Sequence, residues 1–343
     1  MPAVSDELQR MAERVYDFDP SLATLWLEPD GKYQRQGMTL DQLTRRVVDC
    51  LARGFRPLAA ADFPTLYCAW GKARVGSTAL INMFGLAGMP AYFQPVKAVL
   101  RYALTGGDAT PWILPPGTRE PQIFSKDVAG PYLLAECLYI PLQMLVEAGY
   151  PTTKLHLIVL DRDPVHSLAS WLDKWSDRLA PDRLVRNHVL AALNARRVEE
   201  YARRAGVPVT HYVYEASKDA VRAARALFAR LGIAERFTAR CVTDWAEMGQ
   251  LDSKRSGIIH PPEPDVYFVP GLHASDTAYR YRERGVAQVT DAQREILRRC
   301  GVEDVYRATA EACARELGLS IELAPAALRP AINARATASA RTA

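Results

Sequence analysis

The stretch Trp70-Gly71-Lys72-Ala73-Arg74-Val75-Gly76-Ser77-Thr78 decides the fold of this chain. It follows the apolar run 65–69, which has the composition of a buried strand, and it precedes the apolar run 79–84, which opens a helix. A strand, a glycine-containing loop and a helix in this order aim backbone N–H groups and a helix N-terminus at a phosphate. The stretch therefore predicts a phosphate-binding loop at the carboxyl end of a strand.

The cations of this loop stand in unusual places. Gly71 and Gly76 have the G-x-x-x-x-G spacing of an ATP-binding Walker A loop, but Ser77 stands where that loop has its lysine. An ATP site without this lysine loses its main cation for the β- and γ-phosphates. Because Lys72 and Arg74 lie inside the loop instead, the sequence favours a different phosphate ligand.

A second strand end carries a second candidate phosphate site. The apolar run 155–160 reads as a strand and is followed by Arg162 and Pro164. Proline suits the first position of a helix, where its missing N–H costs nothing. Ser170 lies eight residues after Arg162, about two helical turns along. We expect Arg162 and Ser170 to converge on one phosphate at the mouth of this helix.

Together the two segments resemble the sulfotransferase family that uses 3′-phosphoadenosine-5′-phosphosulfate (PAPS). The family's 5′-phosphosulfate loop, [KR]-x-G-[ST]-T, is matched by Arg74-Val75-Gly76-Ser77-Thr78. Its 3′-phosphate motif, R-x-P-x(5)-S, is matched by Arg162, Pro164 and Ser170. The resemblance implies a P-loop-like α/β fold, with the first motif and Lys72 around the phosphosulfate and the second around the 3′-phosphate.

Weaker matches follow in the family's order between residues 63 and 250. Lys126, in Phe124-Ser125-Lys126, is similar to the lysine that reaches the transferred sulfuryl group. Tyr214, in Val213-Tyr214-Glu215, resembles a tyrosine near the adenine. Thr243 and Trp245 lie in a segment similar to one that closes over the nucleotide. Further along, Arg280 and Arg282 are candidates to clamp the 3′-phosphate from a late loop.

The catalytic base is where the chain departs from the family. Some members carry a histidine two residues after the strand lysine, where this chain has Val128. Other members carry a glutamate before a proline, and this chain has Gln94 before Pro95. Neither side chain accepts a proton. The base is therefore expected to be Asp127, His273 or another group of the late loop, or else the acceptor is acidic enough to need little help.

Composition sets broad limits. The chain has 343 residues, 49% of them apolar and 24% charged, which suits a normal globular core. The formal net charge of +4 suits one small polyanion and does not argue for nucleic acid. Six cysteines lack metal-binding spacing and lie mostly in apolar runs, so buried free thiols are expected. With no apolar signal core and no apolar run of about 20 residues, a reducing cytoplasm is expected.

Strand and helix patterns alternate along most of the chain. Residues 1–60 read as a helical accessory segment in which Thr39 caps a helix over 40–51. Residues 61–320 read as one α/β domain with a parallel sheet covered on both faces, a three-layer arrangement, and 321–343 as a tail. The expected strands are 65–69, 122–125, 155–160 and 207–214. One helix is expected to begin after the loop and to end at about residue 86. Further helices are expected over 131–148, 183–204, 219–231, 291–299 and 303–317. The Pro- and Gly-rich residues 249–285 read as a lid or binding loop.

The sequence thus predicts transfer of a sulfuryl group from PAPS to a hydroxyl, or an amine, of a small molecule, with release of 3′-phosphoadenosine-5′-phosphate (PAP). No metal, nucleic acid or membrane span is expected. Two alternatives stay open, an ATP-dependent P-loop phosphotransferase and a non-catalytic nucleotide-binding protein that has lost its base. The sequence identifies neither the acceptor nor the oligomeric state.

Overall fold

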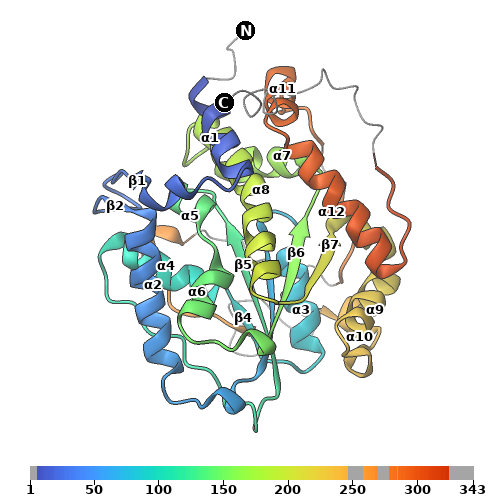
Figure 1. Cartoon of the computed structure of the whole chain (residues 1–343). Helices are drawn as coiled ribbons and strands as arrows, with labels where there is room; N and C mark the ends of the chain where they lie inside the picture. Colours follow the sequence, from blue (N-terminus) through green and yellow to red (C-terminus); the bar gives the residue numbers. More distant parts are fainter. Residues whose placement is uncertain (1–5, 246–257, 269–277, 284, 324–343) are drawn as a thin grey trace, which may run out of the picture.

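A six-stranded sheet forms the centre of the protein (Figure 1). The structure is a computed structural model that describes residues 6–245, 258–268, 278–283 and 285–323. The strand order is β7-β6-β3-β5-β4-β8, and every neighbouring pair is parallel. The strands are β3 (Thr65–Lys72), β4 (Ala91–Phe93), β5 (Gln122–Ala129), β6 (Leu155–Asp161), β7 (Val209–Val213) and β8 (Ile258–Ile259). The predicted α/β class with a parallel sheet is confirmed.

The side chains of β3 alternate between two hydrophobic cores. Leu66, Cys68 and Trp70 belong to one core, and Tyr67 and Ala69 belong to the other. Successive side chains of a strand point to opposite faces, so these two cores lie on the two faces of the sheet. A strand that is buried on both faces reads as an unbroken apolar run, as the sequence of β3 does.

Helices cover both faces and one edge of the sheet (Figure 1). The face packed against Trp70 is covered by α2 (Leu40–Phe55), α4 (Pro95–Thr105), α5 (Leu134–Leu138), α6 (Pro141–Glu147), α7 (Pro164–Trp175) and α8 (Pro181–Arg204). The opposite face is covered by α3 (Ser77–Leu86), α9 (Ala220–Arg230) and α10 (Arg240–Thr243). The last helix, α12 (Val302–Leu317), packs along β7 and adds side chains to both cores, with α11 (Asp291–Arg299) against it. The three-layer arrangement follows from these contacts.

The first sixty residues pack on the first of these helical layers. Helix α1 (Asp6–Tyr16) lies against α8, and α2 lies against α4 and α6. Thr39 caps α2 with a capping box, as predicted, and the helix runs on to Phe55. Between α1 and α2, the short strands β1 (Trp26–Leu27) and β2 (Met38–Thr39) form an antiparallel pair. The division of the chain at residue 60 stays a prediction.

Several elements differ from the sequence-based expectation. The single helix expected over 131–148 is two helices, because Pro141 lacks the N–H that would continue α5 and instead begins α6. Strand β5 runs to Ala129, so Lys126 lies within the strand rather than after it. Strands β4 and β8 have three and two residues, too few to show an alternating pattern. Ile258–Ile259, inside the expected loop, is the outer strand of the sheet.

All six cysteines are buried and unpaired, which confirms the prediction of free thiols. Burial raises the pKa of the Cys68 thiol to about 12. Within the described ranges, none of the helices combines the length and the hydropathy needed to cross a bilayer.

Candidate functional site

The predicted phosphate loop joins β3 to α3, and two of its residues have a left-handed backbone conformation. Arg74 has φ 70° and Gly76, at the N-cap of α3, has φ 80°. The loop is flanked by the carboxyl ends of β5 and β6, the two neighbours of β3. In open α/β sheets this edge is where ligands bind. The strand, the loop and the helix therefore follow one another as the sequence predicted, and phosphate binding stays a prediction.

Two features of the loop favour glycine at position 76. The first is its positive φ, and the second is the close approach of the Tyr214 ring. A Cβ atom at Gly76 would lie 2.6 Å from Cδ2 of the Tyr214 ring. Tyr214 follows β7, and its hydroxyl accepts a hydrogen bond from the backbone N–H of Arg282 at 3.0 Å. The ring therefore lies directly on the loop, and its predicted place near an adenine stays a prediction.

The two predicted phosphate motifs meet in space. Nε of Arg74 donates a hydrogen bond to Oγ of Ser170 at 3.0 Å, which joins the β3–α3 loop to α7. The guanidinium of Arg162 lies 4.4 Å from the centre of the Tyr214 ring, and its Nη1 is 3.4 Å from the carbonyl oxygen of Arg74. Nε of Arg162 is buried without a hydrogen-bond partner. Such an atom is unusual in a folded protein and is a natural anchor for an anion.

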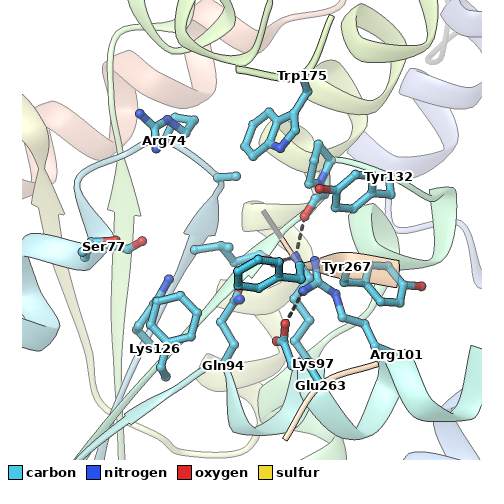
Figure 2. Close-up of a pocket in the computed structure, with 17 residues that line it drawn as sticks. Arg74, Ser77, Gln94, Lys97, Arg101, Lys126, Tyr132, Trp175, Glu263 and Tyr267 are labelled. Atoms are coloured by element: carbon cyan, nitrogen blue, oxygen red, sulfur yellow. Dashed lines mark hydrogen bonds and ion pairs between the residues drawn. The ribbon is translucent and has the colours of Figure 1, made fainter. Parts of the chain in front are cut away.

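A pocket opens beside the loop, with an empty volume of about 730 Å³ including its mouth (Figure 2). One side carries Arg74, Ser77 and Lys126, and the other carries Tyr132, Trp175 and Tyr267. The remaining lining residues are Ala73, Thr78, Phe93, Gln94, Lys97, Arg101, Val128, Gly130, Pro131, Glu263 and Phe268. The pocket is thus cationic on the side of the sheet and aromatic on the other.

Lys126 supplies a buried cation that makes no ion pair with any of the described residues. Its side chain rises from β5 beside Phe93 of β4, with Nζ 3.7 Å from the ring centre, and it is 3% exposed. Among the described residues, Nζ has no hydrogen-bond or ion-pair partner. Burial, and then the nearby charge of Lys97, lower the pKa of Lys126 to about 7. A bound anion would relieve this imbalance of charge.

A network of charges supports the pocket from α4. Nε of Arg101 lies 2.8 Å from Oε1 of Glu136, and its Nη1 lies 2.7 Å from Oε2 of Glu263. Lys97 donates to the carbonyl oxygens of Val128 and Gly130. Burial lowers the pKa of Lys97 to about 8, although Glu136 opposes this shift. The ion pair between Arg101 and Glu263 holds the segment that contains Glu263 against the pocket.

Gln94 occupies the junction between β4 and α4. It has φ 54°, a left-handed conformation that non-glycine residues seldom adopt, and its N–H donates to the carbonyl oxygen of Lys126 at 2.7 Å. Its side chain lines the pocket, and Oε1 is buried without a partner. Unusual backbone conformations of this kind concentrate at functional sites.

Asp127 is corrected as a candidate base. It lies on β5 next to Lys126 and so points to the opposite face of the sheet. Its Oδ1 accepts a hydrogen bond from the backbone N–H of Lys97 at 2.8 Å, in the first turn of α4. Asp127 does not line the pocket, although burial raises its pKa to about 6. Asp127 therefore caps the first turn of α4 and lies away from the pocket.

Lys72 is corrected as a phosphate ligand. It is the last residue of β3, it is almost fully buried, and its ammonium forms an ion pair with Asp161 of β6. The same Nζ donates to the carbonyl oxygen of Arg162 at 3.1 Å. Lys72 therefore fixes the two strand ends that carry the loop and Arg162, beneath the loop rather than within the pocket.

The structure does not bring Thr243 and Trp245 to the pocket. Thr243 is exposed, and its hydroxyl bonds to Ala239 and Asp244 nearby. Trp245 is a core residue, stacked on Tyr279 with ring centres 5.6 Å apart. Val75 is likewise a core side chain of the loop.

The late-loop arginines lie beside Tyr214. The carbonyl oxygens of Arg280 and Arg282 face Tyr214 and Arg162 respectively, while both arginine side chains are exposed. They remain candidates for a clamp. His273 lies outside the described residues.

Comparisons with protein families, curated proteins and solved structures found no match to this chain. The site rests on its own geometry. Sequence reasoning missed the pocket residues of α4 and its neighbours, namely Lys97, Arg101, Tyr132, Trp175, Glu263 and Tyr267. One signal was present in the sequence. Pro95 lies two residues after the short apolar run 91–93, and proline is typical of the first position of a helix.

Proposed function

We propose that this protein is a PAPS-dependent sulfotransferase with a P-loop-like fold. The observation that carries the proposal is the convergence of Arg74, Lys126 and Arg162 at the carboxyl edge of three adjacent parallel strands. PAPS carries two anionic groups, the 5′-phosphosulfate and the 3′-phosphate, and the site offers cations at two places. Arg74 and Lys126 face the pocket, and Arg162 lies on the Tyr214 side of the loop. Cations in the pocket and beside Tyr214 support a ligand that carries a phosphosulfate and a second phosphate.

The proposal assigns a role to each part. Arg74, Ser77, Thr78 and the N–H groups at the start of α3 bind the phosphosulfate, and Arg162 with Ser170 binds the 3′-phosphate. The orphaned Nε of Arg162 supports the second assignment. During transfer, negative charge grows on the oxygen that bridges phosphorus and sulfur, so fixed cations at that atom speed the reaction. Lys126 takes this role, and PAP leaves. The acceptor is a hydroxyl, or an amine, of a small molecule.

Two alternatives fit the geometry less well. An ATP-dependent phosphotransferase needs a lysine that reaches the β- and γ-phosphates. Ser77 stands at that place, and Lys72 is paired with Asp161. A non-catalytic nucleotide-binding protein is consistent with Gln94 and Val128, which do not accept protons. Lys126, which is buried and forms no ion pair with the described residues, favours an enzyme, because simple binding does not require a cation that costs stability. The six free thiols support a reducing location such as the cytoplasm.

Ligand-induced stabilisation tests the proposal. A ligand that binds only the native state raises the melting temperature by mass action, by the equivalent of about 2.7 kcal/mol at a hundred times its Kd. We expect PAP to stabilise the protein and ATP with Mg²⁺ to do much less at equal concentration, measured by differential scanning calorimetry. Equal stabilisation by ATP and PAP would favour the phosphotransferase. Binding of PAP without any turnover of labelled PAPS over a broad pool of acceptors would favour the non-catalytic protein.

Arg162→Ala tests the 3′-phosphate assignment. Loss of a charge-assisted contact should weaken PAP by about 1.5–3 kcal/mol, or roughly 10- to 150-fold. Adenosine 5′-phosphosulfate lacks the 3′-phosphate and should bind with nearly unchanged affinity, as measured by calorimetry. Arg225→Ala is the matched control, because Arg225 also lies over an aromatic ring, that of Phe237, but away from the site. If Arg162→Ala weakens both nucleotides equally, the 3′-phosphate does not contact Arg162.

A further inference from the structure

The far wall of the pocket is a rigid set of aromatic rings. Tyr132 and Tyr267 lie edge to face with centres 5.6 Å apart, and Tyr33 stacks on Tyr132 at 4.4 Å. The hydroxyl of Tyr267 donates to the carbonyl oxygen of Tyr33 at 2.7 Å. Trp175, which is buried, completes this side of the pocket (Figure 2). Flat aromatic surfaces held in fixed positions favour a flat, apolar ligand.

Three buried polar atoms around this wall lack partners. They are Oε1 of Gln94, Nε1 of Trp175 and the hydroxyl of Tyr132. Buried polar groups of native proteins are nearly always hydrogen-bonded. All three residues line the pocket. The Gln94 oxygen accepts a hydrogen bond, and it faces the same pocket as Lys126 (Figure 2).

The charges of the pocket favour an acidic hydroxyl. Four cations line it, Arg74, Lys97, Arg101 and Lys126. Among the described lining residues, Glu263 is the one carboxylate, it is paired with Arg101, and there is no imidazole. An alkyl hydroxyl has a pKa near that of water, about 15.7, and needs a strong base. A phenol, with a pKa of about 10 as in tyrosine, ionises far more readily among cations.

We propose that the acceptor is a phenol, whose ring lies against Tyr132 and Trp175 and whose oxygen lies between Gln94 and Lys126. This inference rests on the proposed sulfotransferase function and names its substrate class. The hydroxyl donates to Oε1 of Gln94, which orients it, and its proton then passes to water at the mouth of the pocket. The phenolate oxygen forms the new bond to sulfur while the bond from sulfur to the 5′-phosphate oxygen breaks. The products are an aryl sulfate, PAP and one proton, and no oxidant or metal is consumed.

Optical titration of p-nitrophenol tests the subsite without turnover, because the phenolate absorbs in the visible and the phenol does not. In the presence of PAP, we expect the pKa of the bound probe to fall by about one unit relative to the free probe. Lys126→Met should abolish this fall. A bound probe that titrates as it does in solution, or a probe that does not bind, would overturn the proposal.

Turnover of a matched pair of acceptors separates this inference from the proposed function. Phenol and cyclohexanol have rings of the same size, and we expect phenol to be sulfated at least a hundredfold faster. Comparable rates would overturn the phenol assignment and leave the sulfotransferase standing. If PAP does not bind at all, the proposed function fails, and the titration with p-nitrophenol alone still reports on the subsite.

Two variants locate the phenol in the pocket. Trp175→Phe keeps an aromatic ring and removes the N–H group that lacks a partner. We expect this variant to raise KM for phenol slightly. KM should rise more for phenols that carry a second hydrogen-bond acceptor. Gln94→Ala should raise KM for phenol about tenfold and leave PAP affinity unchanged. Trp112→Phe is the control, because Nε1 of Trp112 is also buried without a partner but lies outside this pocket. Equal effects of Trp175→Phe and Trp112→Phe on KM would contradict the proposed orientation.

Discussion

Gly76 shows how a single residue is fixed by two independent constraints. Its left-handed φ costs any other residue about 1–2 kcal/mol. Its missing side chain makes room for the Tyr214 ring. A side chain here would displace Tyr214, and in a phosphate loop it would also block the approach of the backbone to the phosphate. Loss of binding in a Gly76 variant therefore reflects the loop and the aromatic ring together.

The variant Gly76→Ala should lose more stability than its control. The new methyl group meets Tyr214, which adds about 1–3 kcal/mol of overpacking to the backbone cost. Gly88→Ala is matched to it, because Gly88 has φ 76° and open space around its Cα. Urea unfolding should show the larger loss for Gly76→Ala, and calorimetry should show loss of PAP binding in this variant alone. Equal losses in both proteins would mean that Tyr214 moves aside without cost.

At the scale of elements, the sequence predicted best where patterns are long. The loop, β3, β6, α7 and α9 follow from apolar runs, Pro164 and Gly232, and the structure confirms their positions. The short strands β4 and β8 were missed, since two or three residues carry no period. The eleven-residue helix α4 was missed as well, although Pro95 marks its first position. The aromatic half of the pocket comes from distant segments, such as Tyr132, Trp175 and Tyr267. Their meeting depends on tertiary packing, which no local pattern reports.

A triad centred on the buried residue His211 joins three elements outside the pocket. His211 of β7 places Nδ1 2.8 Å from Glu316 of α12 and Nε2 2.9 Å from Glu199 of α8. Although burial opposes the charged form, the hydrogen bonds and charges of Glu199 and Glu316 raise the pKa of His211 to about 9. The charged imidazole thus links the edge strand to helices of both layers.

This triad predicts a pH dependence of stability. Because the folded pKa of about 9 lies above the ordinary value of 6.5, the stabilisation is fully present below pH 6.5. It is lost as the pH rises through 9, and roughly 2–3 kcal/mol is at stake. Urea unfolding of wild type should show this decline relative to His211→Gln. His156→Gln is the control, since burial lowers the pKa of His156 to about 4 and this residue stays neutral throughout. A decline that persists in His211→Gln would assign it to other groups.

At the scale of the whole molecule, the proposed function and stability oppose each other at Lys126. Most buried charges of the fold are paired, as in Lys72 with Asp161 and Arg101 with Glu136. Lys126 has no such partner among the described residues, and its pKa falls to about 7, chiefly through burial. A depressed pKa in the folded state means that the charged form costs folding free energy. An anion bound in the pocket would offset this cost.

The variant Lys126→Met removes that cost together with the catalytic cation. Below pH 7, Lys126 is protonated in both the folded and the unfolded wild type, so the cost of the buried charge to the folding free energy is fully present. This cost fades as the pH rises towards 10.5, the ordinary pKa of lysine. Lys126→Met should therefore be more stable than wild type by about 1–4 kcal/mol at pH 6.5, with a gap that closes by pH 10. PAPS should narrow the gap at pH 6.5, because it stabilises the charged lysine, and turnover should fall at least a hundredfold in the variant. Denaturant titrations at several pH values, with and without PAPS, measure each of these effects. A wild type that is the more stable protein at pH 6.5 would show that Lys126 has a counterion and would remove the electrostatic argument for an anion in this pocket.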